Sequence, residues 1–352
     1  MKILAIDLGK FKSVACVYES TTGEHTFPTV STKPGDIHDL RASHRPERVV
    51  VEIGSAAGWV HDLAPTMGLK IQIANPNHDA WRWKNVKRKT DKDDALKLAQ
   101  LSAMNQLPTL QIPGAKVRQW RSLIGYRNTL VARRTAIKNH IRSILDRQGI
   151  SWPGGKSGWT DTSISALKLT AQSALYTQPD DLWRFEILME LEALAQGQTL
   201  IVQVEKRLDE LAKADGRVQQ LQSIPGVGPR LAEVVVAVID DAKRFKNAKQ
   251  VGAYAGLTPT QFESGTMKRQ GGISGRGNKL LRTLLVQVTW LGRRCNGKIS
   301  AIFEEVCRGS KTRRKIAVIA TARRLLVICW AMLRDGTTWR EPSRPLISLP
   351  AS

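Results

Sequence analysis

The stretch KILAIDLGK at residues 2–10 determines how the first part of the chain folds. Apolar and small residues run from Ile3 to Ile6, a pattern typical of a buried strand, and the run ends in Asp7 with Gly9 close behind. A carboxylate at the end of a central strand is costly to bury without a partner, and a metal ion or a basic group is the usual partner. A turn or helix-capping role for Asp7 is the alternative.

The segments that follow this strand alternate in an informative order. We predict strands at Ile3–Asp7, at Val14–Glu19 and near 25–30, joined as a meander with a hairpin turn at Thr22-Gly23. After them the pattern predicts a helix (34–43), a strand (48–53), a helix (58–67), a strand (70–74) and two helices (77–84 and 91–104). A meander that leads into alternating helices and strands predicts a mixed α/β sheet with helices on both faces. The same order of elements is found in the ribonuclease H-like fold.

The rest of the chain is predicted to be helical. Pro108 and Pro113 mark a break before two long helices, at 115–148 and 180–213, which repeat apolar residues at every seventh position. Such helices are typical of a coiled-coil hairpin, formed with each other or with another subunit, and an ordinary helical domain is the alternative. Further on we expect a glycine-rich turn, a loop at 257–277 and helices near 278–295, 299–307 and 312–333. The predicted domains are 1–110, 111–216 and 217–335, with an irregular tail at 336–352.

The composition indicates a polyanionic partner. The chain has 54 Lys and Arg against 31 Asp and Glu, a formal net charge of +23, and the basic residues cluster at 116–147, 264–294 and 308–324. Nucleic acid is the first candidate and an acidic membrane the second, whereas an evenly basic protein would lack the clusters. Four widely spaced cysteines predict reduced thiols in a bacterial cytoplasm. No signal peptide or membrane-spanning run is expected, because Arg323 and Arg324 interrupt the most apolar segment, 316–333.

Four acids lie where the predicted sheet would bring them together. Asp7 and Glu52 end strands that are neighbours in a ribonuclease H-like sheet, whereas Asp91 and Asp94 share one helix face and Asp93 lies off it. Converging carboxylates repel each other unless a cation joins them, and Mg²⁺, as one ion or two, takes oxygen ligands and promotes attack at phosphorus. A helix N-terminal charge is the alternative for the last pair. Basic side chains suited to phosphate lie close by in the sequence: Arg82, Lys84, Lys87, Arg88 and Lys89.

Two glycine-rich segments follow the long helices. The residues Ile224-Pro225-Gly226-Val227-Gly228, followed by an apolar helix, are typical of a helix-hairpin-helix turn, whose backbone N–H groups approach a DNA phosphate. A tight turn between packed helices is the alternative. The second segment contains Ser264, whose hydroxyl becomes a nucleophile if its proton is removed, although an ordinary turn serine is the simpler interpretation. The other residues predicted to contact nucleic acid are Arg127, Arg133, Arg134, Lys268, Arg269, Arg276, Lys279, Arg313 and Arg314.

Taken together, these motifs resemble the IS110 family of transposases. The resemblance covers about residues 2–307 and rests on motifs in matching order: Asp7, Glu52, Asp91 with Asp94, the turn at 224–228, Ser264-Gly265, Gly277-Asn278 and Leu281-Arg282. It implies a RuvC-like N-terminal domain whose four acids hold Mg²⁺, and a C-terminal domain whose Ser264 becomes covalently linked to a DNA phosphate. It also implies a structured non-coding bridge RNA as guide, double-stranded donor and target DNA, and a homo-oligomer, up to a tetramer.

The chain departs from the family pattern in two places. Gly275 stands where many relatives carry a basic residue, and the stretch after Arg308 is longer than expected, which leaves the RNA contacts of that stretch open. The prediction is therefore a transposase or recombinase that inserts and excises a mobile element.

Three rival functions remain. A RuvC-like nuclease would hydrolyse DNA with metal-activated water, and a non-catalytic nucleic-acid-binding scaffold would leave the acids without a role. An actin-like sugar kinase is suggested by Asp7-Leu8-Gly9-Lys10, but no second phosphate-binding turn follows residue 150.

Overall fold

The computed structural model describes residues 1–340 except 67, 69, 76–89, 173–180 and 265–266. The chain divides into two compact units, Met1–Arg118 and Gln119–Ser352. The predicted helix at 77–84 and most of the predicted tail lie outside the described residues. The finer domain boundaries predicted from the sequence stay predictions.

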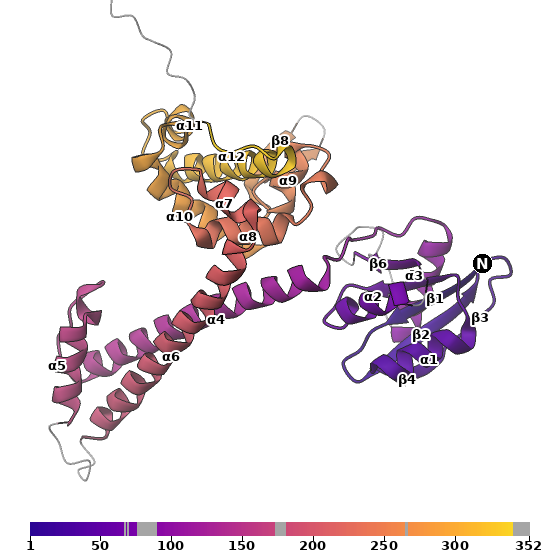
Figure 1. The fold of residues 1–352 in the computed structure, drawn as a ribbon, viewed down its shortest axis with the longest axis horizontal. Coiled ribbons are helices and arrows are strands. Elements are labelled where there is room, and N and C mark those ends of the chain that lie inside the picture. Colours follow the sequence, from indigo (N-terminus) through magenta and orange to yellow (C-terminus); the bar gives the residue numbers. More distant parts are fainter. Residues whose placement is uncertain (67, 69, 76–89, 173–180, 265–266, 341–352) are drawn as a thin grey trace, which may run out of the picture. The chain divides into compact units, whose positions relative to one another are not determined.

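The first unit is built on a six-stranded mixed sheet (Figure 1). Its strands are β1 (Lys2–Asp7), β2 (Lys12–Glu19), β3 (His25–Thr26), β4 (Thr29–Ser31), β5 (Arg48–Glu52) and β6 (Lys70–Ala74). The order is β3-β2-β1-β5-β6, with β1 and β2 antiparallel, β1, β5 and β6 parallel, and β4 paired to β2 beside β3. A meander followed by parallel strands on the far side of β1 is the ribonuclease H-like arrangement, which confirms the predicted fold class.

One predicted strand is divided in two. The expected third strand near 25–30 forms β3 and β4 instead, with Pro28 between them. Proline has no N–H to donate to a strand ladder, so continuous pairing cannot pass through it. Its carbonyl oxygen still accepts a hydrogen bond from the Ala15 N–H at 2.9 Å, which keeps the segment on β2.

Three helices cover the two faces of this sheet. Ile3 and Ala5 of β1 pack in one cluster with α3 (Asp91–Ala103), whereas Leu4 and Ile6 pack in another with α1 (Pro34–His44) and α2 (Ala57–Thr66). Successive strand residues point to opposite faces, so a continuous apolar run is what a sheet covered on both sides requires. Side chains at positions 3, 5 and 7 of β1 therefore share the α3 face.

The second unit begins with a helical hairpin. Helices α4 (Ala115–Arg147) and α6 (Leu182–Lys213) lie side by side (Figure 1), and α5 (Asp161–Gln172), preceded by a 3₁₀ turn at Ser157–Trp159, packs beside α6. Hydrogen bonds between the two helices recur every six to eight residues, with residue numbers that rise along α4 and fall along α6: Arg127 to Glu205, Arg134 to Gln198 and His140 to Glu190. The two long predicted helices are confirmed, and within this chain they pair antiparallel with each other.

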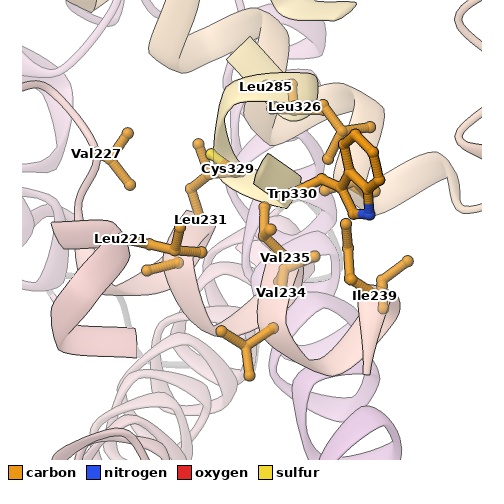
Figure 2. Packing of buried hydrophobic residues seen from close by; sticks show 14 of the residues in the cluster. Leu221, Val227, Leu231, Val234, Val235, Ile239, Leu285, Leu326, Cys329 and Trp330 are labelled. Carbon is orange, nitrogen blue, oxygen red and sulfur yellow. The ribbon is translucent and has the colours of Figure 1, made fainter. Parts of the chain in front are cut away.

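A helical core completes the second unit. Its helices are α7 (Gly216–Gln222), α8 (Pro229–Ile239), α9 (Ala248–Tyr254), α10 (Lys279–Cys295), α11 (Gly297–Cys307) and α12 (Arg314–Asp335), with a 3₁₀ turn at Ala242–Arg244. Residues 231–239 of α8 are all buried, and Figure 2 shows several of them with Cys329 and Trp330 of α12. The Trp330 indole N–H donates to the Ala242 carbonyl at 2.8 Å, so its one polar group is satisfied inside the core.

Two expectations for this unit were wrong. The segment 257–277 is not a loop, because β7 (Pro259–Ser264) and β8 (Met267–Ile273) pair antiparallel as a hairpin. Helix α12 is also long enough and apolar enough to cross a membrane, judged by length and composition alone, and it is the one such helix among the described residues. No such run was expected from the sequence. Half of its apolar window is buried inside the protein, where Leu325, Leu326 and Cys329 join the core, so the same composition also suits a core helix.

Candidate active site

Two acids of the first unit end adjacent parallel strands. Ile6 of β1 is the register partner of Val51 of β5, so Asp7 and Glu52 are each one residue further along at the carboxyl end of the sheet. Ala5 and Val50, two residues earlier, belong to the cluster under α3. Because side chains alternate between faces, both half-buried carboxylates lie on the α3 side of the sheet.

The acids of α3 have different roles. Asp93 closes a capping box: its carboxylate accepts from the Thr90 N–H at 2.9 Å and from the Thr90 hydroxyl at 2.7 Å. These hydrogen bonds lower the pKa of Asp93. Asp94 is only 8% exposed and sits beside Ala95 in the helix face that packs on the sheet, whereas Asp91 is exposed.

Three carboxylates therefore belong to the α3 side of the sheet, beside its apolar core. Asp7 and Glu52 are at neighbouring strand ends, and Asp94 belongs to the helix that packs on the same face of the sheet. Among the described residues, no group of three or more His, Cys, Asp or Glu side chains is close enough to hold a metal ion as it stands. The donor set is nevertheless all carboxylate, which fits Mg²⁺ and gives no reason to expect a softer metal. The basic residues 82–89 lie outside the described residues.

The glycine-rich turn of the second unit joins α7 to α8. Gly226 has φ +93°, and a Cβ there would lie 3.2 Å from the Cys295 Sγ and from the Gly292 Cα of α10. Gly228 is the N-cap of α8, with φ −85°, and a Cβ added there would meet no atom within 4 Å. The first glycine is therefore needed for packing, and the second leaves the start of α8 accessible to a ligand.

Ser264 is the last residue of β7 and pairs in register with Met267 of β8. It therefore stands where the hairpin turns. The side chains of Ser264 and Lys268 are outside the described part, while Arg269, opposite Phe262, is exposed. The two-residue connection, which begins with a glycine, is a local hairpin signal that the sequence prediction missed, although the flanking segments are polar and glycine-rich.

The base of this hairpin is held by close backbone crossings. A Cβ at Gly256 would lie 1.8 Å from the Arg276 carbonyl oxygen, and one at Gly277 would lie 2.2 Å from the Tyr254 carbonyl oxygen. The Arg282 guanidinium donates to the Ala255 carbonyl at 3.0 Å and to that of Arg276 at 3.3 Å. The base of the hairpin is thus fastened to α9 and α10.

The predicted phosphate-contacting residues of this unit divide into two groups. Arg127 donates to Glu205 at 2.9 Å and Arg134 to Gln198 at 3.1 Å, so both are engaged in joining α4 to α6. The others have exposed or half-buried side chains where these are described: Arg133, Arg269, Arg276, Lys279, Arg313 and Arg314.

The sheet and its acidic edge define the first unit as a ribonuclease H-like domain. A family model of the DEDD transposases of IS110 elements matches residues 4–149, and a second model, described as the transposase IS116/IS110/IS902 family, matches residues 218–304. Both halves of the chain therefore carry domains of one family, in the order predicted. The chain belongs to the IS110 family of transposases, which are DNA-processing enzymes.

Several known proteins are similar over most of their length. A probable family 20 transposase of Pseudomonas aeruginosa is 27% identical, covering 97% of this chain and 99% of the relative. The transposase for insertion sequence element IS1111A of Coxiella burnetii is 29% identical, with 97% and 92% covered. The pilin gene-inverting protein of Moraxella lacunata is 27% identical, with 76% and 73% covered. A structure of T. thermophilus RuvC in complex with Holliday junction substrate matches 31% of this chain and 99% of its own, with 17% identity and a TM-score of 0.24.

Proposed function

We propose that this transposase breaks and rejoins DNA through a covalent phosphoserine formed by Ser264. The observation that carries the proposal is the place of Ser264 at the end of β7, where the hairpin turns, while the base of the hairpin is anchored by Arg282. A nucleophile that must reach a phosphate inside DNA is suited to the end of a hairpin strand, away from the base that fixes it. The exposed Arg269 on the same hairpin is suited to hold that phosphate.

The proposed step conserves the number of phosphoester bonds. The Ser264 oxygen attacks the scissile phosphorus and loses its proton to a base, while the bond from phosphorus to one deoxyribose oxygen breaks and that oxygen takes up a proton. In the reverse step a deoxyribose hydroxyl attacks the phosphoserine and releases the serine. No external energy source is then needed for rejoining, whereas hydrolysis by water would give up the phosphoester bond.

We infer that Asp7, Glu52, Asp91 and Asp94 hold Mg²⁺ in the same reaction. When bound, the ion supplies positive charge at the phosphate oxygens and lowers the pKa of an oxygen nucleophile. The carboxylates themselves position the ion, and the neighbouring strand ends of β1 and β5 support this role. The basic residues around 82–89 would add phosphate contacts.

The remaining partners are inferred from family resemblance. A structured bridge RNA selects donor and target DNA, and the protein works as a homo-oligomer of two to four copies. The basic residues predicted from the sequence, including the exposed Arg133, Arg276 and Lys279, contact the nucleic acids. From the same resemblance we infer that the protein acts on double-stranded DNA in a bacterial cytoplasm.

Denaturing electrophoresis with end-labelled DNA tests the serine. The parent protein should form a protein–DNA adduct that maps to the peptide containing Ser264, and Ser264→Ala should bind DNA equally well yet form neither adduct nor recombinant. Ser274→Ala is the matched control, because Ser274 lies on the same hairpin and its N–H is held by the Thr258 carbonyl at 2.8 Å. This variant should keep the adduct.

The same experiment separates the rivals. Cut DNA without any adduct would favour the water-dependent nuclease, for which the paired strand-end acids are sufficient. An adduct that persists in Ser264→Ala would place the nucleophile elsewhere. Binding without any metal-dependent cleavage would leave only the nucleic-acid scaffold.

A further inference from the structure

A groove runs along the base of the β7–β8 hairpin in the second unit. One wall consists of Pro259, Ile273 and the glycines of β8, and the others come from α9, α11 and α12. Its volume of about 1140 Å³ is large enough for a short length of polymer chain. Ile316, which lines it, is 61% exposed, so the groove presents an apolar side chain to solvent.

Five cationic side chains and no acid are among the described residues that line the groove: Lys249, Lys298, Lys315, Arg323 and Arg324. Arg324 is paired with Glu305, which lies outside the groove. No ion pair among the described residues involves Lys249, Lys315 or Arg323. Because neighbouring cations repel each other, this arrangement has a cost that an anionic ligand would offset.

The floor between these charges is aliphatic. Ile302, Ile319 and Val327 contribute to it, and none of the described lining residues is aromatic. A surface that binds single strands by stacking their bases has aromatic side chains, so this groove lacks that mode of binding. Aliphatic groups flanked by cations match a sugar–phosphate backbone, whose sugars are partly apolar and whose phosphates are spaced along the edge.

We propose that this groove binds the DNA backbone on one side of the scissile phosphate. The proposal rests on the proposed role of Ser264, which fixes where cleavage occurs. Five strand steps separate Pro259 in the groove wall from Ser264, a distance of about 17 Å at 3.3–3.4 Å per residue. Phosphates follow each other at about 3.4 Å along the axis of one strand, so the groove would hold phosphates about five positions from the cut.

Helix α12 makes this surface, since Lys315, Arg323 and Arg324 belong to it. The family model that matches the second unit ends at residue 304, before α12 begins. The stretch after Arg308, for which the sequence predicted only that Arg313 and Arg314 contact nucleic acid, thus receives a specific role in holding DNA.

A double variant, Lys249→Gln with Lys315→Gln, tests the groove in the full-length protein. Both side chains are exposed and lie on different walls. Each lost phosphate contact should reduce the slope of log K against log salt by about 0.9, so duplex DNA binding should lose about 2 from its slope. The control, Lys206→Gln with Lys213→Gln, removes the same charge from an acid-rich face of α6 and should leave the slope unchanged.

Phosphate-ethylation interference on the same duplex locates the contact. Ethylation about five positions from the cut should weaken binding of the parent and of the control, but not of the groove variant. An unchanged slope in the groove variant, or a change seen with structured RNA and not with DNA, would overturn the proposal. Both readouts measure binding, so an absent Ser264 adduct would refute the serine mechanism without deciding whether the groove binds DNA. In that case the ethylated positions that interfere are counted from the mapped cleavage site in the DNA.

Discussion

The side chains of Asp93 and Asp94 are neighbours in sequence but differ in environment. Asp93 is held by Thr90 in a capping box, and Asp94 is buried against the sheet that carries Asp7 and Glu52. Helix geometry alone separates them by about 100° around the axis, which places them on different sides. A metal-binding role is therefore proposed for Asp94 and not for Asp93.

Paired substitutions test this division of roles. Asp7→Asn and Asp94→Asn should abolish DNA cleavage at every Mg²⁺ concentration, because a ligand charge is lost, while DNA affinity stays within about twofold. Asp93→Asn should keep cleavage and lower the melting temperature only slightly, through its weakened cap. Cleavage titrated against Mg²⁺, with thermal unfolding in parallel, measures both effects. Full activity of Asp7→Asn at the parent's Mg²⁺ requirement would contradict the proposed site.

A buried acid in the second unit gives the protein a pH dependence. Glu233 of α8 is 1% exposed, with one oxygen 3.2 Å from the Arg230 guanidinium and the other without a hydrogen-bond partner among the described residues. Burial raises the pKa of Glu233 from 4.5 to about 7, against the opposing attraction of Arg230. Arg230 is also paired with Asp209.

The sign of this effect follows from proton binding. Between about pH 4.5 and 7 the folded state holds a proton on Glu233 that the unfolded state has lost, so this group's stabilising contribution is complete below pH 4.5 and is lost as the pH rises through 7. Glu233→Gln cannot ionise. Its melting temperature relative to the parent should therefore rise by a few degrees from pH 5 to pH 8, whereas the exposed control Glu210→Gln should show no such trend. A constant difference for Glu233→Gln would contradict the prediction.

Among the elements, the turn between α7 and α8 combines two functions in two glycines. Gly226 allows close approach of α10 at a positive φ, and Gly228 opens the start of α8. The Asn296 side-chain amide donates to the Pro225 carbonyl at 3.1 Å and ties the turn to the start of α11. Packing therefore accounts for the first glycine, which the helix-hairpin-helix prediction assigned to phosphate.

Alanine at each position separates packing from binding. Gly226→Ala should cost about 1–3 kcal/mol, because a Cβ meets α10 and the positive φ is strained. Gly228→Ala should change stability by less than about 1 kcal/mol yet weaken DNA binding, if α8 begins at a phosphate. Urea unfolding and DNA anisotropy give the two quantities. Equal DNA affinity for Gly228→Ala and the parent would remove the phosphate contact from this turn.

For the molecule as a whole, the excess of positive charge is the dominant property. The net charge of +23 is far beyond what solubility requires, and several arginines lie outside the ion pairs of the described residues. Such a surface binds nucleic acid by releasing counterions, and this contribution does not depend on the base sequence of the nucleic acid.

The salt dependence of binding measures that contribution. Affinity of the full-length protein for duplex DNA should fall by about 10³-fold or more between 50 and 200 mM salt, as for proteins that contact six or more phosphates. Fluorescence anisotropy at a series of NaCl concentrations gives the slope. A flat dependence would mean that the basic clusters are not the contact surface.

The sequence by itself determined the main elements and the family. Strand β1 follows from a continuous apolar run, and the long helices α4 and α6 follow from apolar residues at every seventh position. The order of the sheet follows from a meander that leads into alternating helices and strands. The strand-end positions of Asp7 and Glu52 follow from the same patterns.

Tertiary structure decided what those patterns leave open. The β7–β8 hairpin, with polar and glycine-rich strands, is fastened by Arg282 and by backbone crossings at Gly256 and Gly277, contacts between residues about 20 positions apart. Helix α12 resembles a membrane-length segment until its core contacts are known. In each case the deciding free energy comes from packing partners distant in sequence, and local propensity is too weak to outweigh it.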